Sequence, residues 1–371
     1  MIHQSIAKRL LGGLQGARAR AKPLLGRVAL AAAGAVALSA PVLAADAPIR
    51  WRMAMGFPTT VPGFGEQPRS FIDAVERSSG GTIEIKLFEP DKLVPAFGIF
   101  DAVKENKIPA GFTTMLYDQG KIPAAPLFAS VPFGLDPIEY FTWVFEGGGF
   151  QLAREIYGKH GIVATPCGLT GAETAGWYRK EINSVDDIKG LRLRYAGVGG
   201  KVMQKLGASI TVLPGGEVYQ ALERGTIDGA EFSQPSVDLA LGFNRIAKTN
   251  YLPGWHQTTS AFHLLVNAGV WNKLSETQRG LIETACTASL VRGLAASEIL
   301  QANALAKYKE LGVSANAIPD NVLKALKTAT DQVMEEESAA DADFKKVYDS
   351  QRTFMQNYKE WKVLGYLPRN F

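Results

Sequence analysis

The feature that most constrains the fold of this chain is the alternation of strand-like and helix-like segments along residues 49–267. Short apolar runs with a period of two predict strands, and the amphipathic runs between them predict helices. This alternation is typical of parallel sheets whose faces are covered by helices. The predicted fold class is therefore α/β.

The predicted elements form two blocks, and the second block starts near Thr170. In the first block we expect strands at 49–55, 82–88, 110–115 and 162–167, and helices at 71–77, 93–106 and 140–160. In the second block we expect strands at 171–180, 190–197, 209–213, 226–232 and 263–267, and helices at 185–188, 201–206 and 217–224. A length of 371 residues suggests two domains, because single cores stop growing near about 250 to 300 residues.

Beyond the last predicted strand the chain has a helical pattern. Residues 276–311 contain no proline, and a single helix of that length would measure about 54 Å. Gly280 and Gly293 could interrupt such a helix. One long domain-bridging helix and two stacked helices are therefore both open alternatives.

The basic residues of the chain are concentrated at its N-terminus. The formal net charge is +4, but six basic residues and no acidic ones lie in the first 45 positions. Taking those six from the 40 basic residues leaves 34, against 36 acidic ones. The rest of the chain thus gives no reason to expect a nucleic-acid partner.

The same segment has the features of a secretory signal peptide. A basic start precedes an uncharged apolar run over 28–40 and the small-residue pattern V-L-A at 42–44. A membrane anchor is the alternative, but the run is shorter than the roughly 20 residues that a spanning helix needs. Lys8 and Arg9 leave the twin-arginine route open beside the general secretory route. We therefore predict that residues 1–45 are removed and that the mature protein is periplasmic.

Residues on which many enzymes and metal proteins depend are scarce. Two cysteines, Cys167 and Cys286, exclude a multi-disulfide scaffold, and four scattered histidines are too few for a histidine metal cage. The mature sequence has no G-x-S-x-G, H-E-x-x-H, C-x-x-C, phosphate-loop or dinucleotide-binding pattern. An exported two-domain chain of this kind is more typical of a ligand-binding receptor than of an enzyme.

Candidate binding residues lie at predicted strand ends, where open α/β sheets bind their ligands. Arg194 ends one strand and could hold a carboxylate through two parallel hydrogen bonds, although a solvated arginine is the commoner alternative for this stretch alone. Glu231 ends another strand, and a buried carboxylate there needs an arginine or a cation as its partner. Further candidates are Glu173, in the middle of a predicted buried strand, and the aromatic run at 251–257.

Several motifs follow one another along the mature chain, namely GAETAGW, DIKGLRLR, LPGGEVYQALERGTIDGAE, YLPGW and LLVN. In this order they resemble the solute receptors of TRAP transporters, the DctP-type periplasmic binding proteins. FPTTVPGFG, LVPAFGIFDAV and VPFGLDPIEY are most similar to the 2-oxo acid and lactate subgroup. The resemblance implies a receptor that closes around a small organic carboxylate and delivers it to a cation-driven membrane permease.

The resemblance also implies a two-lobed periplasmic binding protein fold, with two α/β domains joined by crossing strands and a long helix. We place domain I at 46–169 and 259–300, and domain II at 170–258 and 301–371.

The charged tail after Pro319 is predicted to be helical, with Trp361 and Tyr366 as docking anchors. Dimers in the resembling subgroup imply that an extended C-terminal helix can pair with a second copy. A homodimer is therefore an open alternative to a monomer.

The resemblance assigns roles to individual residues. Arg194 matches the arginine that grips the solute carboxylate. Glu231 matches a carboxylate ligand of a cation that bridges solute and protein, and Phe232 would add its backbone carbonyl, although the subgroup has tryptophan there. The side chains expected to line the pocket are Phe57, Tyr117 and Trp255.

Two departures from the subgroup are reciprocal. Glu173 stands where the subgroup usually has glutamine, and Gln257 stands where it has glutamate after P-G-W-W. With Glu231 they keep two carboxylates and one amide, and these hard oxygens suit sodium or calcium. The alternative is that Glu173 is a surface residue and that the change at 257 is a coincidence.

Three classes of function are compared. The receptor is favoured by the resemblance. A metal-dependent periplasmic enzyme would use the pair Glu173 and Glu231, but no nucleophile or water-activating histidine set is visible. A ligand-sensing subunit of a signalling system is the third class. For a receptor, the solute is expected to be a 2-oxo acid, a 2-hydroxy acid or a bulkier monocarboxylate.

Overall fold

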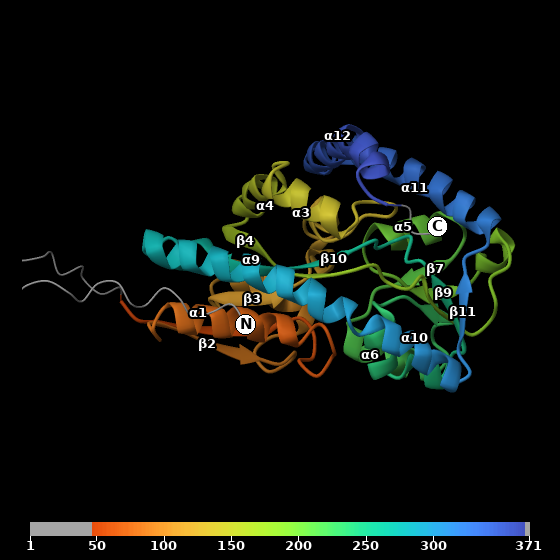
Figure 1. The fold of residues 1–371 in the computed structure, drawn as a ribbon, viewed down its shortest axis with the longest axis horizontal. Helices are drawn as coiled ribbons and strands as arrows, with labels where there is room; N and C mark the ends of the chain where they lie inside the picture. The colour runs from red at the N-terminus through yellow and green to blue at the C-terminus, as the bar shows by residue number, and fades with distance from the viewer. Residues whose placement is uncertain (1–46, 368–371) are drawn as a thin grey trace, which may run out of the picture. The chain divides into compact units, whose positions relative to one another are not determined.

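Two separate β-sheets organise the part of the chain that the computed structural model describes, residues 47–367 (Figure 1). One sheet has five strands in the order β2-β1-β3-β10-β4, and the other has six in the order β11-β9-β5-β8-β6-β7. Helices pack on both, so the predicted α/β class is confirmed. The predicted signal peptide, residues 1–45, lies outside the described residues.

The five-stranded sheet begins with parallel strands. Its members are β1 (Ile49–Met55), β2 (Ile83–Phe88), β3 (Ala110–Thr113), β4 (Ile162–Thr170) and β10 (Ser260–Asn267). β10 lies between β3 and β4 and runs antiparallel to both. The sheet is therefore mixed, because β10 enters it from the other sheet in the opposite direction.

The six-stranded sheet is also mixed. Its members are β5 (Gly176–Tyr178), β6 (Arg192–Arg194), β7 (Ser209–Thr211), β8 (Gly229–Ala230), β9 (Thr249–Leu252) and β11 (Ser314–Ala317). β6 is parallel to β7 and β8, whereas β5 is antiparallel to β8 and β9. The parallel pair β6 and β8 brings two strand ends to the same edge.

The chain crosses between the sheets through two segments outside strands and helices, 171–175 after β4 and 253–259 after β9, and the second of them turns at residues 255–256. These segments lie side by side, since the Thr259 hydroxyl donates to the Thr170 carbonyl at 2.7 Å and the Glu173 N–H donates to the Gln257 carbonyl at 3.2 Å. Glu173 was predicted in the middle of a strand, and that placement is wrong, because the residue lies in a crossing segment. Its backbone pairs with the second crossing segment instead of with a sheet.

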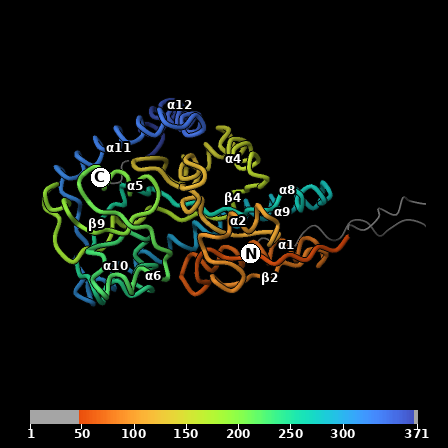
Figure 2. The backbone as a smooth tube through the Cα atoms, turned by 180° about the vertical axis from the view of Figure 1, so that it is seen from behind, coloured from red at the N-terminus to blue at the C-terminus, as the bar shows by residue number. Residues whose placement is uncertain are grey.

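The helical region after β10 consists of two helices in succession, α9 (Glu276–Glu298) and α10 (Gln301–Glu310), both visible in Figures 1 and 2. α9 packs on β4 and α1 (Glu66–Ser78), whereas α10 packs on α7 and β11, so the two are not stacked on each other. The interruption falls at residues 299–300 and at neither candidate glycine. Gly293 instead allows close packing, because a Cβ there would lie 2.6 Å from the Gln67 side chain.

The remaining helices are shorter, apart from the last two. They are α2 (Ile99–Lys104), α3 (Pro137–Phe145), α4 (Gly149–Gly158), α5 (Gly197–Lys205), α6 (Gly215–Glu223), α7 (Pro235–Ala240), α8 (Ala268–Trp271), α11 (Asp320–Ala340) and α12 (Ala342–Leu364). Single 3-10 turns occur at Ala96–Gly98, Met115–Asp118, Ala125–Phe128, Val185–Ile188 and Phe243–Arg245. Among the described residues, no helix has the length and apolar character to cross a membrane.

The C-terminal tail is helical, as predicted, but its proposed anchors do not dock on the described residues. Trp361 and Tyr366 are 58% and 51% exposed, and their rings pack on each other. α12 is held earlier along its length, where Phe344, Val347 and Gln351 are buried. The buried anchoring residues of α12 are therefore in the first half of this helix, while near its end Lys362 pairs with Asp136 and Glu139.

A disulfide joins Cys167 in β4 to Cys286 in α9. The two cysteines are 119 positions apart in the sequence, and no sequence pattern had paired them. The bond fixes a helix to a strand that continues directly into the first crossing segment.

Candidate functional site

Arg194 and Glu231 meet at the predicted strand ends. Arg194 ends β6, and Glu231 directly follows β8, which is parallel to β6 in a register that pairs Arg194 with Ala230. The Glu231 N–H donates to the Arg194 carbonyl at 3.2 Å. Both side chains therefore leave the same sheet edge, and the structure brings these two predicted site residues together there.

The two side chains form a fully buried ion pair. Arg194 Nη1 lies 2.7 Å from Glu231 Oε1, and the exposed fractions of the two side chains are 2% and 0%. Nη1 also donates to the Glu231 carbonyl at 2.9 Å, while Nε and Nη2 each donate to the Leu213 carbonyl at 3.0 Å. A guanidinium has five N–H groups, so one N–H on Nη2 stays available. A solvated arginine is thereby excluded.

Glu231 also contacts the backbone and the second crossing segment. The Ala196 N–H donates to its Oε1 at 2.7 Å, and Gln257 Nε2 donates to its Oε2 at 3.3 Å. Burial alone would raise the pKa of Glu231, but the Arg194 charge and the contacts with His256 and the Ala196 N–H outweigh burial and lower this pKa below its ordinary value. Glu231 is therefore ionised in this environment.

Glu173 is buried beside this pair. Its Oε1 accepts a hydrogen bond from the Ser260 hydroxyl at 2.8 Å, whereas its Oε2 has no hydrogen-bond partner among the described residues. Burial, reinforced by the negative charge of Glu231, raises the pKa of Glu173 well above its ordinary value. The surface alternative for Glu173 is excluded, because the residue is only 2% exposed.

Gln257 completes the reciprocal pair that the sequence singled out. Its Oε1 lies 2.7 Å from the Ser260 hydroxyl, which also lies 2.8 Å from Glu173 Oε1. A hydroxyl donates only one proton, so Ser260 serves one of these two oxygens at a time. The structure thus places Glu173, Glu231 and Gln257 in one cluster.

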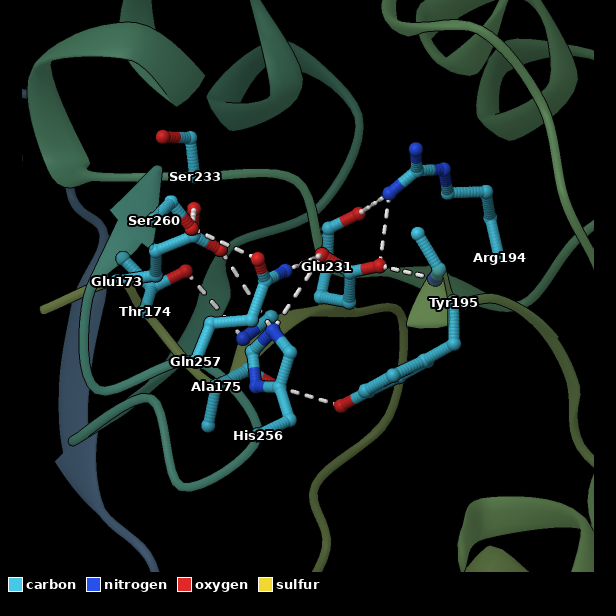
Figure 3. Close-up of polar contacts among 12 residues, drawn as sticks. Glu173, Thr174, Ala175, Arg194, Tyr195, Glu231, Ser233, His256, Gln257 and Ser260 are labelled. Atoms are coloured by element: carbon cyan, nitrogen blue, oxygen red, sulfur yellow. Dashed lines mark hydrogen bonds and ion pairs between the residues drawn. The ribbon is translucent and has the colours of Figure 1, made fainter. Parts of the chain in front are cut away.

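His256 is a member of this cluster that the sequence reasoning missed. Its Nε2 lies 3.3 Å from Glu231 Oε2 and 3.7 Å from Glu173 Oε2, and its side chain is buried (Figure 3). The signal was present, since the resembling subgroup has tryptophan at this place in P-G-W-W. The sequence analysis dismissed the four histidines together as too scattered for a metal site, and so it did not consider a contact between His256 and the two glutamates. We call Glu173, Arg194, Glu231, His256, Gln257 and Ser260 the polar cluster.

The donor set of the polar cluster fits a cation. One oxygen or nitrogen from each of Glu173, Glu231 and His256 lies within 4.8 Å of the others, and all three residues are buried. The unpartnered Oε2 of Glu173 points to the same conclusion, because a buried carboxylate oxygen without a partner is costly. Phe232 places its ring 5.2 Å from the Arg194 guanidinium, and the role of its backbone carbonyl stays a prediction.

A cavity opens on the polar cluster and has an aromatic side. Its lining includes Glu173, Arg194, Phe232, Gln257 and Ser260. The same cavity is also lined by Phe57, Phe64, Tyr117 and Phe262, which we call the aromatic wall. These four rings contact one another through Phe57, whose centroid lies 5.1 to 5.4 Å from each of the other three.

The structure brings two of the three predicted lining residues, Phe57 and Tyr117, to this cavity. The hydroxyl of Tyr117 is buried and has no hydrogen-bond partner among the described residues. Burial raises the pKa of Tyr117 to about 12, with the Arg194 charge acting in the opposite direction. Trp255 lies apart, on a neighbouring apolar cavity that it shares with Tyr178 and Met203.

Comparison with known proteins agrees with this geometry. The model of the family described as bacterial extracellular solute-binding protein, family 7, matches residues 57–341. A Nostoc protein named a monocarboxylate 2-oxoacid-binding periplasmic protein is 34% identical over 320 residues, which cover 86% of this chain and 87% of the relative.

Solved structures are similar over the same length. A TRAP transporter solute-binding protein from Bordetella bronchiseptica, described as a mixed-occupancy dimer with calcium and picolinate, has a TM-score of 0.84 and 33% identity, covering 86% of this chain and 96% of its own. A Colwellia psychrerythraea protein with calcium and pyruvate has a TM-score of 0.82 and 34% identity, covering 85% and 97%. A Pseudoalteromonas atlantica protein with sodium and pyruvate has a TM-score of 0.82 and 33% identity, covering 85% and 96%.

Proposed function

Because the chain belongs to the bacterial extracellular solute-binding proteins of family 7, we propose that it captures a small 2-oxo or 2-hydroxy monocarboxylate together with a cation and delivers it to a TRAP membrane permease. Members of this family are receptors, which favours binding over the metal-dependent enzyme considered above. The observation that carries the proposal is the cavity that joins a buried arginine and two buried carboxylates to an aromatic wall.

The charges of the polar cluster explain why solute and cation would bind together. If Glu173 ionised as well as Glu231, these two residues and a carboxylate solute would bring three negative charges against the single positive charge of Arg194, and the raised pKa of Glu173 already reflects part of that repulsion. Like charges at this separation repel strongly in a buried site. A cation held by Glu173, Glu231, Gln257 and the Phe232 carbonyl would supply the missing positive charge. Each ligand would then strengthen the binding of the other.

Arg194 is proposed to bind the solute carboxylate through the N–H that the protein leaves available. The bidentate grip expected from the sequence would require its contact with the Leu213 carbonyl to open. The aromatic wall would exclude water and receive the apolar part of the solute. The similar proteins crystallised with pyruvate or picolinate support a small monocarboxylate over a dicarboxylate.

Location and domain boundaries are part of the proposal. The family is extracytoplasmic, and we propose that residues 1–45 act as a cleaved signal peptide. The division into 46–169 with 259–300 and 170–258 with 301–371 is supported by the strands of the two sheets, which follow it apart from Thr170 at the end of β4. α12 departs from it, because this helix of the second part packs on α3 and α4 of the first. Closure of the two parts on the solute would bend the crossing segments.

The test is isothermal calorimetry with pyruvate and lactate, with calcium or sodium present or removed by chelation and dialysis. Arg194→Ala should weaken solute binding at least about 100-fold, because it removes a charge-assisted contact and unpairs a buried carboxylate. Arg192→Ala is the matched control, since Arg192 lies on the same strand but pairs with Asp228 at the surface. Equal affinity in Arg194→Ala and wild type would contradict the proposal.

A further inference from the structure

The polar cluster contains a nitrogen at the place where its two carboxylates converge. His256 Nε2 lies between Glu231 Oε2 and Glu173 Oε2, at 3.3 Å and 3.7 Å (Figure 3). Every other candidate ligand of this site is an oxygen, supplied by a carboxylate, an amide or a backbone carbonyl. The imidazole therefore changes the chemistry of the site as well as its shape.

We propose that His256 Nε2 is a direct ligand of the bound cation and makes this receptor select a divalent first-row transition metal, such as zinc or cobalt, over sodium or calcium. The inference rests on the proposed function in that it concerns the same cation. It goes beyond that function because it replaces sodium or calcium with a transition metal and adds His256 to the ligands of the cation.

The distances support shared ligation. Two ligands that each lie about 2.0 to 2.2 Å from one tetrahedral ion are about 3.3 to 3.6 Å apart. The separations of His256 Nε2 from Glu231 Oε2 and from Glu173 Oε2 are close to this range. The three atoms need only small movements to share one ion, since all of them lie within 4.8 Å of one another.

The ligand types decide which ion is favoured. Sodium and calcium prefer oxygen ligands, whereas imidazole nitrogen suits zinc and the neighbouring transition metals. Imidazole nitrogen and carboxylate oxygen are both zinc ligands, and zinc sites with three protein ligands keep the fourth position open for water or substrate. In this receptor the open position would face the solute, whose carboxylate oxygen could occupy it.

Without an ion, His256 Nε2 is within hydrogen-bond distance of Glu231 Oε2 and carries the proton of that contact. Its other ring nitrogen, Nδ1, has no hydrogen-bond partner among the described residues, so the ring proton can move to Nδ1 when an ion takes the place of the contact at Nε2. Glu231 uses Oε1 for Arg194 and for the Ala196 N–H, whereas its Oε2 has only the two 3.3 Å contacts with His256 Nε2 and Gln257 Nε2, which an ion would replace. Glu173 Oε2 has no hydrogen-bond partner within the described part of the chain.

The experiment measures metal binding directly. Full mature protein is stripped with chelator and dialysed against an equimolar mixture of zinc, cobalt, manganese and calcium in sodium buffer, and the retained metals are counted by mass spectrometry. Calorimetry then gives separate affinities for cobalt and calcium. The visible absorption of bound cobalt reports a nitrogen ligand and its geometry.

Wild type should bind cobalt at least about 100-fold more tightly than calcium, since loss of even a supporting contact to a metal ligand costs about 10- to 100-fold in affinity. His256→Gln, and His256→Trp as the residue of the resembling subgroup, should lose that preference and change the cobalt spectrum. His160→Gln removes a histidine outside the cluster and should change neither. Circular dichroism melting confirms that each variant is folded.

Two results would overturn the inference: a wild type that retains only calcium or sodium, or a His256→Gln variant whose cobalt affinity and spectrum match the wild type. Pyruvate titrations with each metal separate this failure from failure of the proposed function. Pyruvate binding with calcium but not with cobalt refutes the metal assignment alone. Absence of carboxylate binding with every cation refutes the proposed function, while the metal result still stands on its own measurement.

Discussion

The two sides of the cavity differ in the interactions that hold their side chains: hydrogen bonds to charged groups hold most of the polar cluster, where Glu173 Oε2 and His256 Nδ1 have no partner among the described residues, whereas ring contacts hold the aromatic wall. In the polar cluster, Arg194 uses four hydrogen bonds to the protein, and Glu231 is held by both Arg194 and the Ala196 N–H. The aromatic wall makes ring contacts and has one polar atom, the Tyr117 hydroxyl, which has no partner among the described residues. The comparison teaches that the charges of the polar cluster are oriented by the protein's own hydrogen bonds, whereas the aromatic wall is oriented by ring packing alone.

The largest effect should come from breaking the charge balance of the polar cluster. Glu231→Gln leaves the Arg194 charge buried without its partner, which costs about 3 to 5 kcal/mol of unfolding free energy. Urea unfolding measures this loss. Asp228→Asn is the control, because Asp228 pairs with Arg192 at a more exposed position, and its cost should stay below about 1 kcal/mol. A similar loss of unfolding free energy in both variants would mean that the buried Arg194–Glu231 pair contributes no more to stability than the exposed Arg192–Asp228 pair.

A second variant set exchanges charge within the cluster. Glu173→Gln and Gln257→Glu should each weaken solute binding by about tenfold, because each changes the charge beside the cation. The double exchange should recover most of that loss, since it moves one carboxylate without changing their number. Calorimetry on the four proteins gives the coupling energy. If the losses of binding free energy in the two single variants simply add in the double variant, the two residues do not share a cation, and Glu173 has only a structural role.

The aromatic wall is tested through its one polar atom. Tyr117→Phe removes a buried hydroxyl without a partner and should stabilise the empty protein by about 1 kcal/mol. The same change should weaken solute binding a few-fold if the hydroxyl donates to the solute. Thermal unfolding without solute and calorimetry with it measure the two effects. A less stable variant would show that the hydroxyl is satisfied in the empty protein.

The smallest effect concerns Asp118, which follows Tyr117 and lies behind the aromatic wall. Burial raises the pKa of Asp118 to about 7, against the opposing hydrogen bond from Tyr157. The pKa is higher in the folded than in the unfolded state, so the stability contribution is full below about pH 4 and declines as the pH rises through 7. Between pH 6 and 8 the loss is about 1 kcal/mol.

Asp118→Asn should abolish this decline, because asparagine can still accept the Tyr157 hydrogen bond but does not ionise. Melting temperatures at pH 6 and pH 8 measure the difference for both proteins. A decline of the same size in Asp118→Asn would assign it to other groups.

The site residues that could be predicted from the sequence are those that lie at strand ends. Arg194 and Glu231 close predicted strands, and parallel neighbours bring such ends to one edge, so their meeting follows from a local pattern. Glu173 was recognised through its exchange with Gln257, but it was placed in a strand. Its neighbours at 171–175 are all small, and such a run looks the same in a strand and in an extended crossing segment.

His256 and the two cysteines could not be placed from local patterns. The contacts of His256 depend on two crossing segments that lie side by side although they are about 80 residues apart, as the hydrogen bond from the Glu173 N–H to the Gln257 carbonyl shows. The break between α9 and α10 is also nonlocal, because each helix follows the sheet on which it packs. The low helix propensity of Gly280 and Gly293 therefore does not indicate where the break between α9 and α10 falls.

The bond between Cys167 and Cys286 has a consequence for where and when this protein can mature. It closes a loop with a sequence separation of 119, and in the chain-entropy account a cross-link of that span is worth about 4 to 5 kcal/mol against the unfolded chain. Thiols stay reduced in the bacterial cytosol and are oxidised outside it. The chain should therefore gain its full stability only after translocation, and protein produced in a reducing cytosol should melt at a lower temperature until it is oxidised.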